Sequence, residues 1–351
     1  MRGLKIALPL FAMVSSFKVA AHNLDVYGSN PKEAAHILKQ YSAELIEFEN
    51  FFDKITQDFM RNRDITKDIE ALRPKKEALV EKIKKDGDYL YVNFDTIYYD
   101  GNKHYTTIEV IRKNQQERMR FVNSEEHVQR PPQKQDLIAK MTEFEKLQMK
   151  LFMTNQLQSN DYICPVYHCL GDFKHPQLAP YLNAFNDGVV KERTLVLNTM
   201  NHDSNPERRT SAIFLLGHLN NPKEIIALLL PQVNDKNEFV RNAAMRVIGA
   251  TMAKANIEQI DVMPFIKLLD SPMDTDRNKS LLILLQAAKS EPAKTILAQQ
   301  AGPQLLALLK LLQPNNHLPA YDILKRISGK EFAEYDVNAW KNWLNSVSQR
   351  A

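Results

Sequence analysis

The sequence predicts a mostly helical protein in which an α+β domain precedes an α-solenoid. Apolar residues recur at steps of three and four between residues 38 and 59, which is the spacing of one helix face. The period changes to two within residues 88–122, as in β-strands. From residue 209 onward, a two-helix pattern recurs at offsets of 32, 36 and 40 residues. Because each helix pair leaves one face uncovered, repeats of this length stack into a solenoid.

Four segments follow from these patterns. Residues 1–21 are predicted to be a signal peptide and residues 22–130 an α+β domain. Residues 131–171 form a linker helix with a cysteine loop, and residues 172–351 form the repeat domain with a C-terminal cap. We therefore expect two folded domains in one exported chain.

The first 21 residues have the order of a secretory signal peptide. Arg2 and Lys5 precede the uncharged apolar stretch 6–14, and small residues, Ala20 and Ala21, stand where cleavage is expected. We expect export to the periplasm or into the medium. No later stretch approaches the roughly 20 apolar residues of a spanning helix, so we expect no stable membrane insertion after cleavage.

Composition argues against several functional classes. Only 10 of the 351 residues are glycine, and no two lie closer than 14 positions apart. Phosphate-binding loops and the G-x-S-x-G turn need glycines a few positions apart. Without residues 1–21, the chain has 43 basic and 42 acidic residues, unlike a nucleic-acid-binding domain with its concentrated positive charge. We expect no catalytic residues, no cofactor, no metal site and no nucleic-acid partner.

Two helices open the α+β domain. The apolar stripe of residues 38–59 follows Pro31, a residue that suits a helix start, and predicts one long amphipathic helix. A second helical stretch, 65–83, contains Pro74, which is expected to kink it or to begin a new helix. Together they predict a helical hairpin. The Phe-rich stripe is compatible with a homodimer through this helix, but we favour packing within the chain.

Three strands are expected after the hairpin. Alternating apolar residues in 88–99 and 106–110 flank the turn signal Asp100-Gly101-Asn102, and a third strand is expected at 119–122. These strands predict a small antiparallel meander.

The two cysteines, Cys164 and Cys169, lie five positions apart. In an oxidising compartment they are expected to form a disulfide, which would contribute roughly 2 kcal/mol by the loop-entropy estimate. The alternative is a zinc site that adds His168 and His175. We favour the disulfide because this spacing matches no structural zinc pattern.

The helical repeats align on a column of arginines, each preceded by an acidic residue six or seven positions earlier. The pairs are Asp203 with Arg209, Asp235 with Arg241 and Asp270 with Arg277, and a fourth copy has His317 in the arginine column. This pattern resembles the HEAT-like (PBS-lyase-type, armadillo-like) repeat family over about residues 172–345. The resemblance implies an α-solenoid in which these pairs link adjacent repeats and the second helices line a concave face. Trp340 and Trp343 belong to a segment that looks like the cap of such arrays.

The second helices also contain a row of residues, at four-residue steps, that stacking does not require. We predict that this row binds a protein or peptide partner through Thr210, Phe214, His218, Asn242, Arg246, Asn278 and Gln286. Phe214 and Arg246 are the expected anchors, because aromatic and arginine side chains dominate binding hot spots. The alternative is that Phe214 and Leu282, which also lies in the row, are core residues.

Two functions are compatible with this organisation. The first is an exported, non-catalytic binding or scaffold protein. The second is a metal-dependent or lyase-type enzyme that uses the repeats as a substrate platform. The resemblance implies paired His-Glu motifs for such an enzyme, and these are absent, because the histidines are scattered (His36, His104, His127, His202 and His317). Asp274 and Asp276 have the spacing of a metal-binding D-x-D, but acids also favour a helix start. We favour the scaffold.

Overall fold

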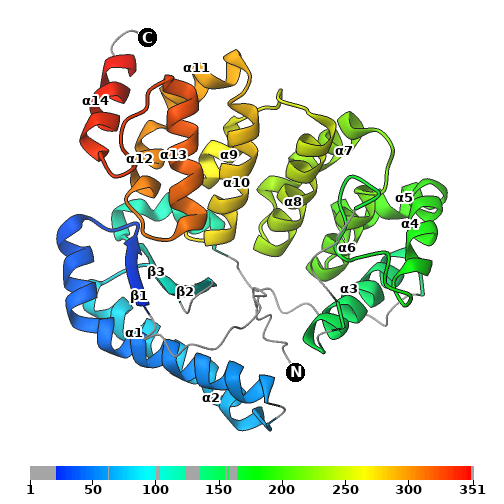
Figure 1. Cartoon of the computed structure of the whole chain (residues 1–351), viewed down its shortest axis with the longest axis horizontal. Coiled ribbons are helices and arrows are strands. Elements are labelled where there is room, and N and C mark those ends of the chain that lie inside the picture. The colour runs from blue at the N-terminus through cyan, green and yellow to red at the C-terminus, as the bar shows by residue number, and fades with distance from the viewer. Residues whose placement is uncertain are drawn as a thin grey trace. The chain divides into compact units, whose positions relative to one another are not determined.

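The computed structural model describes residues 21–61, 63–99, 103–122, 135–154, 156–157 and 164–348 (Figure 1). The predicted signal peptide up to residue 20, the turn at residues 100–102 and the start of the predicted linker lie outside this part of the chain. The described part is mostly helical and contains a small three-stranded sheet. Its helices include none that is both long and apolar enough to cross a membrane.

The chain divides into two compact units. Unit 1 comprises Met1–Met119, Leu305–Tyr321 and Glu334–Val337. Unit 2 comprises Arg120–Gln304, Asp322–Ala333 and Asn338–Ala351.

Unit 1 contains a mixed sheet with the strand order β1-β3-β2. The strands are β1 (Ala21–Tyr27), β2 (Tyr91–Tyr99) and β3 (Lys103–Ile111). β2 pairs with β3 antiparallel, as expected, whereas β1 pairs with β3 in parallel. The predicted antiparallel third strand is therefore wrong, since residues 119–121 belong to the 3₁₀ helix η1 (Lys113–Phe121).

The predicted helical pair is present as α1 (Pro31–Met60) and α2 (Thr66–Gly87). α1 begins with a capping box, in which Asn30 Oδ1 accepts from the backbone nitrogen of Glu33 and the Glu33 carboxylate accepts from that of Asn30, at 3.0 and 3.2 Å. Pro74 lies inside α2 without ending it. The apolar stripe of α1 packs within unit 1, where Leu45 is buried in one cluster with residues of α2 and the sheet.

Residues from the C-terminal part of the chain complete unit 1. The buried carboxylate of Asp25 in β1 accepts from the backbone nitrogens of Leu312 and Gln313, at 2.5 and 3.2 Å. Burial raises the pKa of Asp25 to about 6, more than these hydrogen bonds lower it. His317, at the fourth predicted repeat, is also buried and lies 2.6 Å from Glu334.

Unit 2 is built from helices that pack in succession (Figure 1). Its N-terminal helices are α3 (Leu137–Met153), α4 (Ala179–Lys191), α5 (Arg193–His202) and α6 (Pro206–Leu216). They are followed by α7 (Pro222–Leu229), η2 (Leu230–Asn234), α8 (Glu238–Ala255), α9 (Met263–Leu268), α10 (Asp274–Ala287) and α11 (Glu291–Gln300). The last helices, α12 (Gly302–Leu309), α13 (Pro314–Ser328) and α14 (Val337–Ser348), have residues in both units.

α6 contacts α8 and α8 contacts α10, while α5, α7 and α9 contact α6, α8 and α10 in turn. The apolar columns that aligned the repeats are buried, with Ile213, Met245 and Leu281 each at most 1% exposed. Three successive helix pairs thus share one core.

Buried arginines join these helix pairs. Arg209 Nη2 donates to Asp235 at 2.9 Å, and Arg241 donates to both carboxylate oxygens of Asp276. Asp276 is fully buried and also accepts from Ser271 Oγ. The carboxylate of Asp270 accepts from Gln304 Nε2 at 3.1 Å, and its pairing with Arg277 stays a prediction.

Candidate functional site

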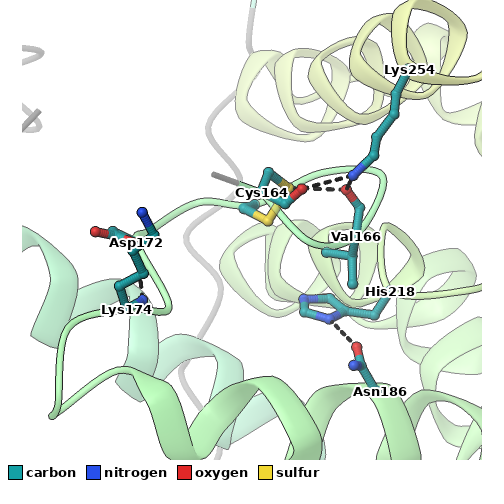
Figure 2. Close-up of a disulfide and its surroundings, with 8 residues drawn as sticks. Cys164, Val166, Asp172, Lys174, Asn186, His218 and Lys254 are labelled. Atoms are coloured by element: carbon teal, nitrogen blue, oxygen red, sulfur yellow. Dashed lines mark hydrogen bonds between the residues drawn. A yellow bond between two sulfur atoms is a disulfide. The ribbon is translucent and has the colours of Figure 1, made fainter. Parts of the chain in front are cut away.

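The cysteine loop lies on the helices of unit 2 (Figure 2). The sulfur atoms of Cys164 and Cys169 are 2.06 Å apart, so they form the disulfide that the sequence predicts. Lys254 Nζ, from α8, donates to the carbonyl oxygens of Cys164 and Val166, at 2.7 Å each. The disulfide occupies both thiols and rules out the alternative zinc set with His168 and His175.

The part of the predicted row that lies on and after α6 is covered by the chain itself. Phe214 is only 6% exposed, because the ring of His168 in the cysteine loop stacks on it with centroids 5.4 Å apart. His218 Nδ1 lies 2.8 Å from Asn186 Oδ1 of α4 (Figure 2), and Thr210 is buried as well. Thr210, Phe214 and His218 are therefore not exposed as expected, and Phe214 follows the core alternative.

The rest of the row remains at the surface of α8 and α10. Arg246 is exposed, and its Cζ lies 6.0 Å from the ring centroid of Phe214, near enough for a cation–π contact. Leu282 is 47% exposed, contrary to its core alternative. Asn242, Asn278 and Gln286 are half-buried. We call Asn242, Arg246, Asn278, Leu282 and Gln286 the α8–α10 row.

A second basic side chain, Lys279 of α10, lies near Arg246. Burial lowers the pKa of Lys279, the positive charge of Arg246 lowers it further, and the negative charge of Asp274 raises it in part. Burial, followed by the charge of Arg246, lowers the pKa of His168 to about 3, so this ring is neutral at pH 7. A site that combines two cations with a neutral imidazole favours an anionic group on whatever binds there.

Several polar atoms at this site lack hydrogen-bond partners. They are His168 Nδ1, Thr210 Oγ1 and Asn242 Oδ1, all buried. An unsatisfied buried polar group costs about 1–3 kcal/mol, so an ordered water or a bound group that satisfies these atoms would stabilise this part of the fold.

A different group of donors lies in unit 1. Within the part of the chain that the structure describes, His22, Glu49 and His104 place one potential metal-ligand atom each within 4.8 Å of the others. The sequence predicts no metal site, and His104 is one of its scattered histidines. Only the parallel pairing of β1 with β3 reveals the group, because it places His22 opposite His104.

Comparison with protein-family models finds no match, and comparisons with curated proteins and with solved structures find no significant similarity. The HEAT-like resemblance therefore stays a prediction that depends on the residues quoted for it.

Proposed function

We propose that this protein is an exported, non-catalytic scaffold that binds a protein or peptide through a HEAT-like solenoid in residues 172–351. The packing of successive helix pairs supports the solenoid, since α6, α8 and α10 contact one another in order. The arginine–aspartate pairs support it too, because each joins one helix pair to the next. Export is supported by the disulfide, since disulfides persist in oxidising compartments.

The observation that carries the binding proposal is the α8–α10 row. Arg246 of α8 and Leu282 of α10 occupy the same position in successive repeats, and both side chains are exposed on helices that contact each other. Lys279 of α10 adds a second basic side chain. The partner is therefore a segment that presents an acidic side chain to Arg246 and an apolar side chain to Leu282. Arginine is enriched at hot spots, and an exposed leucine of this size gains from being covered.

The experiment is capture from the native envelope fraction with the purified protein as bait. The test variant is Arg246→Glu with Leu282→Ser. The matched control is Lys267→Glu with Leu318→Ser, which makes the same kinds of change at exposed positions of α9 and α13.

We expect wild type and control to capture the same protein and the test variant to lose it at least about 30-fold, which corresponds to about 2 kcal/mol. All three proteins should keep the same thermal midpoint, because the substituted side chains are exposed. Equal capture by the test variant and wild type would refute the proposed surface.

A further inference from the structure

The group formed by His22, Glu49 and His104 lies in unit 1, where β1 and β3 meet α1. The parallel register places His22 directly opposite His104 on neighbouring strands. Glu49, on α1, contacts His22 Nδ1 through Oε2, and the same oxygen lies 3.9 Å from His104 Nδ1. The three side chains thus come from three elements and converge on one point.

Two of these side chains have a further polar group beside them. His104 Nε2 lies 3.3 Å from Asp53 Oδ2, whereas His104 Nδ1 is buried and has no hydrogen-bond partner. The nearby carboxylate favours the proton on Nε2 and so leaves the lone pair of Nδ1 facing Glu49. Thr106 Oγ1 donates to Glu49 Oε1 and so leaves Oε2 for the centre of the group. In metal-binding histidines the second ring N–H characteristically donates to a carboxylate, and Asp53 is placed to accept it.

The electrostatic balance favours a cation. Glu49 is 1% exposed, and Asp53 lies next to it. A buried carboxylate beside a second carboxyl group and two imidazole rings gains stability from a dication.

We propose that His22, Glu49 and His104 form a binding site for a divalent first-row transition metal ion, such as zinc or copper. Two imidazole nitrogens and one carboxylate suit these ions, whereas magnesium and calcium prefer oxygen ligands. Tetrahedral coordination with bonds near 2.0 Å places ligand atoms about 3.3 Å apart. The 3.9 Å distance between His104 Nδ1 and Glu49 Oε2 therefore needs to shorten by about 0.6 Å, while the His22–Glu49 contact opens. The ligand atoms of His22 and His104, which lie within 4.8 Å of each other, need to approach by at most about 1.5 Å.

The predicted cleavage after Ala21 adds a donor to this site. This cleavage makes His22 the first residue of the mature chain. His22 then offers two donors, its free α-amino group and Nδ1 of its imidazole ring. An amine and an imidazole on one residue form a chelate ring, which copper(II) favours most strongly among these ions. The three side chains define the site with or without this group.

The test is metal titration of the purified protein after removal of bound metal with a chelator. We expect one equivalent of Zn²⁺ or Cu²⁺ to bind with a dissociation constant below about 1 μM and to raise the thermal midpoint by mass action. Glu49→Gln and His104→Gln, which nearly keep side-chain volume, should each weaken binding at least 100-fold. His36→Gln is the matched control, because His36 also lies 2.6 Å from a carboxylate, Asp86, but is exposed and belongs to no group of three potential ligands within the described residues.

Binding weaker than about 100 μM in wild type, or equal losses in His36→Gln and His104→Gln, would overturn the proposal. If the variants fail to fold, the Cu²⁺ electron paramagnetic resonance spectrum of wild type decides. Coupling to two imidazole nitrogens supports the site, and a spectrum without nitrogen coupling overturns it. Protein that begins at His22 should bind Cu²⁺ at least tenfold more tightly than protein that keeps additional residues before His22. Equal affinities would show that the α-amino group is not a ligand.

Discussion

Removing the carboxylate of Asp276 should strongly destabilise unit 2. Arg241 is 1% exposed and donates to both oxygens of Asp276, which is itself fully buried. Its guanidinium also donates to the carbonyl oxygens of Asp235 and Phe121, so it is held in place and cannot turn towards water. Asp276→Ala leaves this cation buried without its counter-charge, which costs about 3–5 kcal/mol. For a unit of this size, that cost corresponds to a fall of roughly 6–20 °C in the thermal midpoint.

Asp322→Ala is the matched comparison, because its carboxylate is 49% exposed and lies 3.2 Å from Lys325 Nζ. An exposed ion pair contributes little to stability, so we expect this variant to lose only about 0–1 kcal/mol. The assay is thermal unfolding followed by circular dichroism, supported by hydrogen exchange in α8 and α10 because the two units can unfold separately.

A third variant separates charge from packing. Replacing the pair together, as Arg241→Met with Asp276→Leu, should recover most of the loss, because apolar side chains of similar size often substitute for a buried ion pair. This prediction is refuted if Asp322→Ala costs as much as Asp276→Ala, or if Asp276→Ala costs less than about 1 kcal/mol.

Three further predictions concern other contacts. Phe214→Ala should lower the free energy of unfolding by about 3–5 kcal/mol, because the ring is buried beneath His168. A near-unchanged denaturation midpoint would show that the Phe214 ring is not part of the core. Reducing the bond between Cys164 and Cys169 should cost about 2 kcal/mol, measured as the shift in thermal midpoint with and without reductant, and Cys164→Ser with Cys169→Ser should abolish that shift. Asp25 has a folded-state pKa of about 6, above its ordinary value of 3.8. Its protonated carboxyl group therefore favours the folded state at low pH, and this contribution is lost as the pH rises from about 4 through 6. The difference in unfolding free energy between wild type and Asp25→Asn should change across that window, and a constant difference would count against the buried carboxyl group.

Local sequence patterns predicted the helices well. The three-and-four spacing before residue 60, with Asn30 and Pro31 ahead of it, predicted α1, which begins at Pro31. The apolar columns of the repeats are buried where the alignment placed them, including Ile213 and Met245. Both features depend on residues within a few turns of each other, so periodicity reveals them.

The errors involve residues that are distant in the sequence. β1 pairs with a strand about 80 residues later, so no local alternation identifies it as the third strand or brings His22 to His104. Phe214 is covered by His168, from a loop 46 residues earlier, and its own helix pattern cannot predict that cover. Arg241 donates to Asp276 because the start of α10 places that carboxylate against it, and no local pattern joins two residues 35 positions apart.

Hydrogen exchange of the exported protein with and without its captured partner tests the binding proposal most directly. We expect slower exchange in α8 and α10 when the partner is bound, with no change in α1 and α2. Protection confined to other helices, with α8 and α10 unaffected, would contradict it.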